Sequence, residues 1–262
     1  MKMKRIHIIM FLMGAAVTAS AQKLPNVQKE SVRAPSIIKI DGKATEWDNK
    51  FKAQNSATEL FYTVSNDDEN LYFTANTTLK DIMIKIVRGG ITLSFNPTLN
   101  KKTDGAMAFT YPSFDLEDMS KVANMLVLTD KRNLEKNPGE EFVTAAELTK
   151  VFSGKAKTVS LSGIKEIANK ELAIYNENGI QVAAQFDDNL GYTYELAVPL
   201  KYLSLPDGGT KAFSYQIKVN EPKPLAPKFD GTGTPPPPPP PPMGISTVSA
   251  TDVWGEYTLA KK

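Results

Sequence analysis

The chain has 262 residues, with 31 Lys and Arg against 29 Asp and Glu, no cysteine, and a single histidine, His7. Without cysteine there is no disulfide and no Cys nucleophile, so stability must come from an ordinary hydrophobic core. Nucleic acid and anionic membrane surfaces call for a clustered basic excess, which this balance of charges does not favour, and we expect neither as a partner.

Residues 1–21 have the form of a secretory signal peptide. A positively charged start is followed by a short apolar run and by an A-x-A cleavage site at Ala19–Ala21, just before Gln22. The apolar run is shorter than the roughly 20 residues that span a bilayer, and no cysteine follows it to carry a lipid. We therefore expect a periplasmic or secreted protein of a Gram-negative bacterium that is not lipid-anchored. Its mature chain would begin with a leader at 22–36 and would not insert into a membrane.

Cleavage would also remove His7, the only histidine. The mature chain could then build neither a Ser-His-Asp triad nor an ordinary zinc site. Glu195 could act as a general acid, but glycosidases need two carboxyl groups at roughly 5–9.5 Å, and the sequence does not pair it with another. We therefore expect a non-catalytic protein, with a carboxylate-based glycoside hydrolase as an alternative.

Along the chain, apolar and polar residues alternate with period two, the pattern of strands that bury one face. The clearest alternating runs are 60–64, 71–75, 180–186, 192–198 and 213–219, and further strand candidates are Ile37–Ile40, Ile91–Phe95, Ala106–Thr110 and Asp252–Leu259. Turn-forming residues separate these runs, which predicts an all-β fold, mainly an antiparallel β-sandwich. One or two short helices are expected in insertions, within Glu140–Phe152 and at Leu79–Val87, where the alternative is a strand with a bend.

A single sandwich domain is expected over 37–262, interrupted by two segments. Residues 115–139 form a polar, weakly patterned excursion, in which Lys121–Leu128 could be a strand or a helical turn. A proline-rich loop covers 221–246, and its eight prolines, Pro235–Pro242, would extend about 25 Å as polyproline II. We interpret this tract as a solvated loop between the last two strands; the alternative is that it docks into an aromatic groove of a partner.

Four phrases in a fixed order carry a resemblance: Ile38–Gly42 with Trp47, Asn70–Phe73, Gly191–Leu200, and Val253–Leu259. Together they resemble the β-sandwich superfamily of carbohydrate-binding module family 9 and the DOMON domains, in its exported bacterial branch. The resemblance covers about residues 37–260 and implies a sandwich fold. Carbohydrate-binding members clamp a sugar between exposed rings, whereas haem-carrying DOMON members use Met and His ligands, and the mature chain has no His.

The resemblance places Trp47 and Trp254 in framework phrases, so we expect both to be structural and to lie in the core. Asp41 and Gly42 fit a turn in which the Asp side chain closes onto nearby backbone and Gly42 takes a positive φ. Glu195 is out of phase with its apolar neighbours and should point away from the core.

Exposed rings are the usual physical means of sugar binding, because the apolar face of a pyranose stacks on them. Tyr111 and Phe114, at the exit of an expected strand, are the first candidates for ligand binding. Phe61 is the next, being out of phase with Leu60 and Tyr62. The alternative is that such rings pack under the 115–139 excursion.

The acidic turn containing Asp67 and Asp68 could offer oxygen ligands to calcium. The alternative is that these carboxylates cap the turn, since the spacing of a calcium loop is absent. No other cofactor is expected. The sequence thus favours an exported binding module for a carbohydrate or glycan-like ligand. The alternative is a structural or interaction protein of the envelope, in which the proline loop or a sheet edge engages a protein partner.

Overall fold

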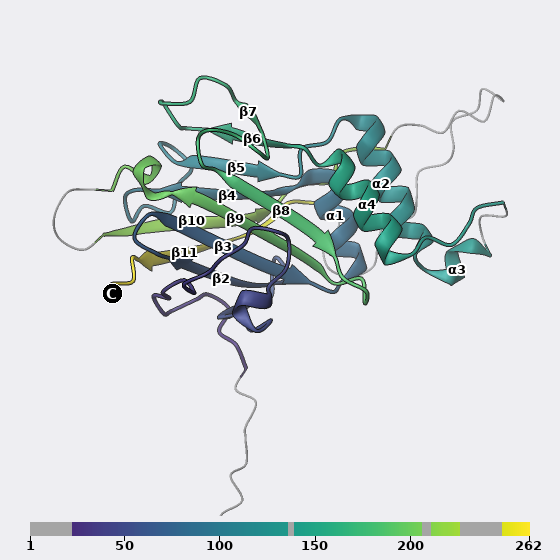
Figure 1. Ribbon diagram of the computed structural model, residues 1–262, viewed down its shortest axis with the longest axis horizontal. Coiled ribbons are helices and arrows are strands. Elements are labelled where there is room, and N and C mark those ends of the chain that lie inside the picture. The colour runs from purple at the N-terminus through teal and green to yellow at the C-terminus, as the bar shows by residue number, and fades with distance from the viewer. Residues whose placement is uncertain (1–22, 136–138, 206–210, 226–247) are drawn as a thin grey trace, which may run out of the picture.

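The computed structural model describes residues 23–135, 139–205, 211–225 and 248–262, and the expected signal peptide and the proline tract lie outside these ranges. Two antiparallel sheets pack face to face, and helices gather at one end of the sandwich (Figure 1). The predicted all-β sandwich is therefore confirmed. Among the described residues, no helix combines the length and the apolar character needed to cross a bilayer.

The first sheet has five strands in the order β1-β2-β3-β9-β8. Its strands are β1 (Ala53–Asn55), β2 (Leu60–Asn66), β3 (Asn70–Thr77), β8 (Gln181–Phe186) and β9 (Tyr192–Pro199). The second sheet has six strands in the order β11-β10-β4-β5-β6-β7. Its strands are β4 (Ile91–Asn96), β5 (Met107–Tyr111), β6 (Thr158–Ser162), β7 (Glu171–Ala173), β10 (Ala212–Val219) and β11 (Thr251–Thr258). The expected strand at Ile37–Ile40 is wrong, because these residues form no ladder with any described strand.

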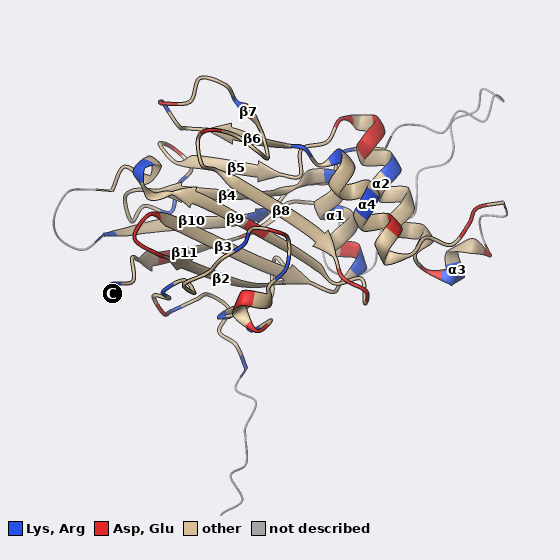
Figure 2. Ribbon diagram, in the orientation of Figure 1, with Lys and Arg blue, Asp and Glu red and all other residues tan. Residues whose placement is uncertain are grey.

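The core lies between the two sheets, where the apolar phase of each alternating strand points inward. Tyrosines occupy much of it, and the hydroxyls of Tyr192 and Tyr194 are buried there without a hydrogen-bond partner among the described residues. Tyr62 on β2 and Tyr215 on β10 join the two sheets through their hydroxyl oxygens at 3.2 Å. Charged residues are found mostly in the loops and helices, while the strands carry few of them (Figure 2).

The described residues contain four α-helices: α1 (Lys80–Gly89), α2 (Leu116–Leu128), α3 (Lys131–Leu134) and α4 (Ala145–Lys155). Two short 3-10 helices are η1 (Thr45–Trp47) and η2 (Leu200–Leu203). Helix α1 links β3 to β4 and α4 begins at a Thr144–Glu147 capping box, so both expected helices are present. The view of 115–139 as weakly patterned is wrong: α2 buries Met119, Val122, Ala123 and Leu126, which recur at helical spacing.

The stretch that we expected to be a leader is part of the fold. The side-chain amide of Gln28 donates to the carbonyl oxygen of Val64 at 2.7 Å and accepts the backbone N–H of Val64 at 2.8 Å. It thus makes the two hydrogen bonds that a neighbouring strand would make. Residues 32–34 continue along the same edge, where Ala34 donates to the carbonyl of Asn66 at 2.9 Å. The segment before residue 37 therefore seals the β2 edge of the five-stranded sheet.

Candidate functional site

The outer face of the five-stranded sheet is covered in part by the chain ahead of β1, which crosses β8 and β9 (Figure 1). Asp41 Oδ1 accepts the backbone N–H of Lys43 at 3.0 Å, and Gly42 has a φ of 84°, so the turn has the expected geometry. A Cβ at Gly42 would lie 2.9 Å from the backbone of Ala184 and Gln185. Only glycine allows the turn to approach β8 this closely.

Glu195, on β9, holds this turn in place. Its Oε2 accepts the backbone N–H groups of Asp41 at 3.1 Å and Gly42 at 3.0 Å. As expected, the side chain points away from the core, but it is only 1% exposed because the turn covers it. Gln185 adds a further bond from its amide nitrogen to the carbonyl oxygen of Asp41 at 3.2 Å.

Burial raises the pKa of the Glu195 carboxyl to about 8, and the nearby charges of Asp41 and Glu46 raise it further. The two backbone hydrogen bonds lower the pKa, but they do not offset these effects. The carboxyl is therefore mostly protonated at neutral pH. Its Oε1 and the indole Nε1 of Trp47 are both buried without a hydrogen-bond partner among the described residues. Glu195 has no open route to a substrate, and its geometry is that of a clamp on the N-terminal turn.

The expectation that Trp47 lies in the core is wrong. It closes η1 on the outer side of the five-stranded sheet and is only partly buried. Trp254 is also only partly buried, because it shares the outward phase of β11 with Asp252 and Glu256, while Val253 and Tyr257 point inward. The framework phrases thus place both tryptophans on outer faces.

Phe61 is partly exposed on the outer face of the five-stranded sheet, in the phase that the sequence predicts. Phe51, in the segment that enters β1, brings its ring centroid to 6.1 Å from that of Phe61. The strand register then aligns one row across the outer face: Gln54, Phe61, Asn76, Thr193 and Gln185. We call Phe51, Gln54, Phe61, Asn76 and Gln185 the amide platform.

The amide groups of this platform retain hydrogen-bonding capacity. Asn76 donates from its side-chain nitrogen to the hydroxyl of Thr193 at 3.0 Å, which leaves its amide oxygen as an acceptor. Gln185 likewise uses its nitrogen on Asp41, and Gln54 is partly exposed beside Phe61. The platform therefore combines two apolar rings with several amide oxygens that can accept hydroxyl donors.

Tyr111 and Phe114 are not exposed rings, and their assignment to a ligand site is wrong. Tyr111 is 2% exposed and Phe114 is 8% exposed. Both pack edge-on against Phe152 of α4, with centroid distances of 6.4 and 5.6 Å. The Tyr111 hydroxyl donates to the carbonyl oxygen of Ala156 at 3.2 Å. The two rings are thus packed and not exposed, but their partners Phe152 and Ala156 lie beyond the 115–139 segment under which the alternative placed them.

The acidic turn at Asp67 and Asp68 is closed by its own partners. Asp67 Oδ1 accepts two backbone N–H groups and its Oδ2 accepts the Tyr72 hydroxyl at 2.7 Å. Asp68 forms ion pairs with Arg33 at 2.9 Å and with Lys262 at 2.6 Å. Within the described ranges no three His, Cys, Asp or Glu side chains gather as a metal site would require. The observed contacts are those of a capped turn.

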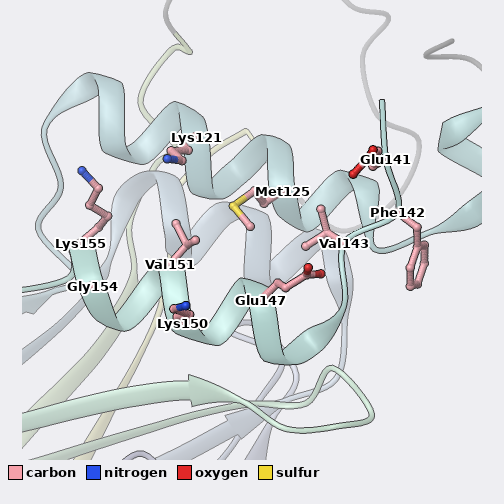
Figure 3. Close-up of a pocket in the computed structure, with 10 residues that line it drawn as sticks. All are labelled: Lys121, Met125, Glu141, Phe142, Val143, Glu147, Lys150, Val151, Gly154 and Lys155. Carbon is pink, nitrogen blue, oxygen red and sulfur yellow. The ribbon is translucent and has the colours of Figure 1, made fainter. Parts of the chain in front are cut away.

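A hollow of about 520 Å³ lies between α2 and α4 (Figure 3). Met125 and Val151 are among the apolar residues that line it, and the charged residues that line it are lysines and glutamates. Two of these charges are already engaged, since Lys155 pairs with Asp118 at 2.8 Å and Glu147 closes the capping box of α4. The hollow contains none of the ligand-site residues expected from the sequence.

Comparison with protein-family models gives no match, and no curated protein matches the chain. The fold therefore defines the class of the protein as a two-sheet antiparallel sandwich closed at one end by helices. Of the residues singled out from the sequence, the outer face of the five-stranded sheet holds Asp41, Gly42, Trp47 and Phe61, and Glu195 lies beneath the Asp41–Gly42 turn.

Proposed function

We propose that this protein is an exported, non-catalytic binding module for a carbohydrate or glycan-like ligand, and that the amide platform is its binding surface. The observation that carries the proposal is the row of amide side chains beside the Phe51–Phe61 ring pair. A sugar presents an apolar face that stacks on rings and a rim of hydroxyls that donate to amide oxygens. The platform offers partners for both.

The non-catalytic part of the proposal is supported by the surroundings of Glu195. Among the described residues, this is the carboxyl whose pKa is raised toward neutrality, as a general acid would need. It is buried beneath the Asp41–Gly42 turn, and its Oε2 is already occupied by two backbone donors. We therefore assign it to holding the turn and not to cleaving a glycosidic bond.

The test is a glycan-array screen of residues 22–262, followed by titration of the best ligand. Phe61→Ala should weaken binding by about tenfold, the loss expected when a stacked ring worth about 1.4 kcal/mol is removed. Asn76→Ala should weaken it as well, with an unchanged melting temperature. The matched control is Phe142→Ala, which removes an exposed ring on the helical end.

Binding that is unaffected by Phe61→Ala would contradict the assignment of the platform. The absence of binding to any glycan at millimolar concentration would contradict the proposed function itself.

A further inference from the structure

Edge strands offer unpaired backbone groups to other chains, and natural proteins usually cover or shorten them. Three of the four sheet edges here are treated in this way. The β2 edge is sealed by β1, by Gln28 and by residues 32–34. On β8, the hydroxyl of Thr149 bonds both the N–H and the carbonyl of Phe186, at 3.1 and 2.8 Å. The β7 edge has only three residues.

The fourth edge, β11, is eight residues long. Leu259 donates its backbone N–H to Lys211, in register with the β10–β11 ladder. Backbone groups alternate in direction along an antiparallel strand, so Thr251, Val253, Gly255 and Tyr257 face β10. The N–H and carbonyl groups of Asp252, Trp254, Glu256 and Thr258 must then face away from the sheet, and no described residue bonds to them.

The side chains along this edge indicate which partner would fit. Asp252 and Glu256 are exposed on the outer face and flank the partly exposed ring of Trp254. Glu256 pairs with Lys101 at 3.1 Å in a largely exposed contact, a kind of ion pair that contributes little to stability. Asp252 accepts from the side chain of Gln216 at 2.7 Å, and Lys218 of β10 lies opposite it in the strand register. Each acid thus has one lysine nearby, but the exposed side chains that the edge strand itself presents on this face include two acids beside an aromatic ring.

Two other occupants fit less well. A second copy paired antiparallel about Trp254 would place Asp252 opposite Glu256, and pairing about Glu256 would place that residue opposite itself; like charges directly opposite are unfavourable. Pairing about Gly255 avoids this, but it places Glu256 opposite Trp254 and Asp252 opposite Thr258, so neither acid meets a basic side chain. The chain's own tract Pro235–Pro242 has no backbone N–H groups and cannot complete a ladder.

We propose that β11 takes up an extended segment of a partner protein by strand addition, with basic side chains opposite Asp252 and Glu256 and an apolar side chain against Trp254. Backbone bonds supply the affinity in this mode of recognition, and alternate side chains supply the specificity. This inference does not depend on the glycan ligand, because it concerns the other sheet.

The first test is amide hydrogen exchange followed by NMR on the mature chain. In dilute protein, the amides of Asp252, Trp254, Glu256 and Thr258 should exchange at least about tenfold faster than those of Val253, Gly255 and Tyr257. Slow exchange of all seven amides at every protein concentration would overturn the proposal, because the chain itself would then cover the edge. Protection that rises with protein concentration would also overturn it, in favour of a second copy.

The second test uses the peptide Thr-Lys-Val-Leu-Val-Lys-Thr as the probe, with a control peptide that has Glu in place of Lys. The basic peptide should protect the four outward amides, and the acidic peptide should bind about tenfold more weakly or not at all. The pair D252N and E256Q should remove this preference, whereas Glu171→Gln on the β7 edge should leave it intact. Failure of the basic peptide to protect these amides at millimolar concentration would overturn the proposal.

Discussion

Glu195 on β9 accepts the backbone N–H of Gly42 at 3.0 Å, a bond that joins two residues 153 positions apart in the sequence. The same oxygen accepts the N–H of Asp41, so a single buried carboxyl secures the turn that covers the outer face of the five-stranded sheet. The chemistry of this carboxyl makes the attachment sensitive to pH, because burial raises its pKa to about 8.

We expect the free energy of unfolding to fall as the pH rises from about 4.5 to about 8. Below this window Glu195 is protonated in both the folded and the unfolded chain, so its contribution is fully present. Within it the unfolded chain releases the proton while the folded chain retains it, which favours unfolding. The full loss is roughly 5 kcal/mol, since a tenfold difference in proton affinity corresponds to about 1.4 kcal/mol.

Glu195→Gln tests this assignment, because the amide keeps an oxygen for the two backbone donors but does not titrate. Urea melts from pH 5 to pH 9 should show a clearly smaller loss of stability for the variant than for the wild type. At pH 9 the variant should be the more stable of the two. Parallel pH profiles for the two proteins would show that Glu195 is ionised in the fold and that our account of the turn is wrong.

Gly42→Ala should destabilise the protein by about 2–4 kcal/mol. Part of this cost is the left-handed backbone, at about 1–2 kcal/mol for a residue with a Cβ, and the rest is the contact at 2.9 Å with the backbone of β8. Gly105→Ala separates the two effects: Gly105 has a φ of 73° but no atom within 4 Å of its Cβ position. Chemical denaturation of both variants measures the difference, and equal losses would show that the turn can lift away from β8 without cost.

The sequence predicts those parts of the fold that depend on local pattern. Alternation located most of the strands, and the Asp41–Gly42 turn followed from its residue types. The alternating pattern also predicts that Tyr111 is buried, because it has the same inward phase as Met107 and Phe109. Helix α2 was missed because its buried Met119, Val122, Ala123 and Leu126 are interrupted by polar Ser120, Lys121 and Asn124 and preceded by two acids.

The amide platform could not have been found in this way. Gln54, Phe61, Asn76 and Gln185 come from four strands, and only the register between strands aligns them in one row. Periodicity also cannot say whether an outward face is later covered by another segment. This is why Glu195 was placed on the correct face but its burial under the N-terminal turn was not foreseen.

Gln28→Ala should cost about 2–4 kcal/mol. The change would leave the N–H and the carbonyl of buried Val64 without partners, and each such group costs roughly 1–3 kcal/mol. Gln54→Ala, on the neighbouring strand, removes a partly exposed amide and should change stability by about 0.5 kcal/mol or less. Thermal melts of the two variants would distinguish them. A loss no greater for Gln28→Ala than for Gln54→Ala would mean that the segment before residue 37 contributes little to the fold.

Tyr111→Ala and Phe114→Ala should act on stability and not on ligand recognition. Both rings are buried against Phe152, which also contacts Phe186 and Tyr192, so truncation opens a cavity where the helices meet the sandwich. We expect each change to cost about 3–5 kcal/mol, the usual range for a buried aromatic residue. Tyr175→Ala is the control, because this ring is 85% exposed and its removal should leave the melting temperature unchanged. A folded Phe114→Ala variant with wild-type stability would show that α4 does not close over this ring.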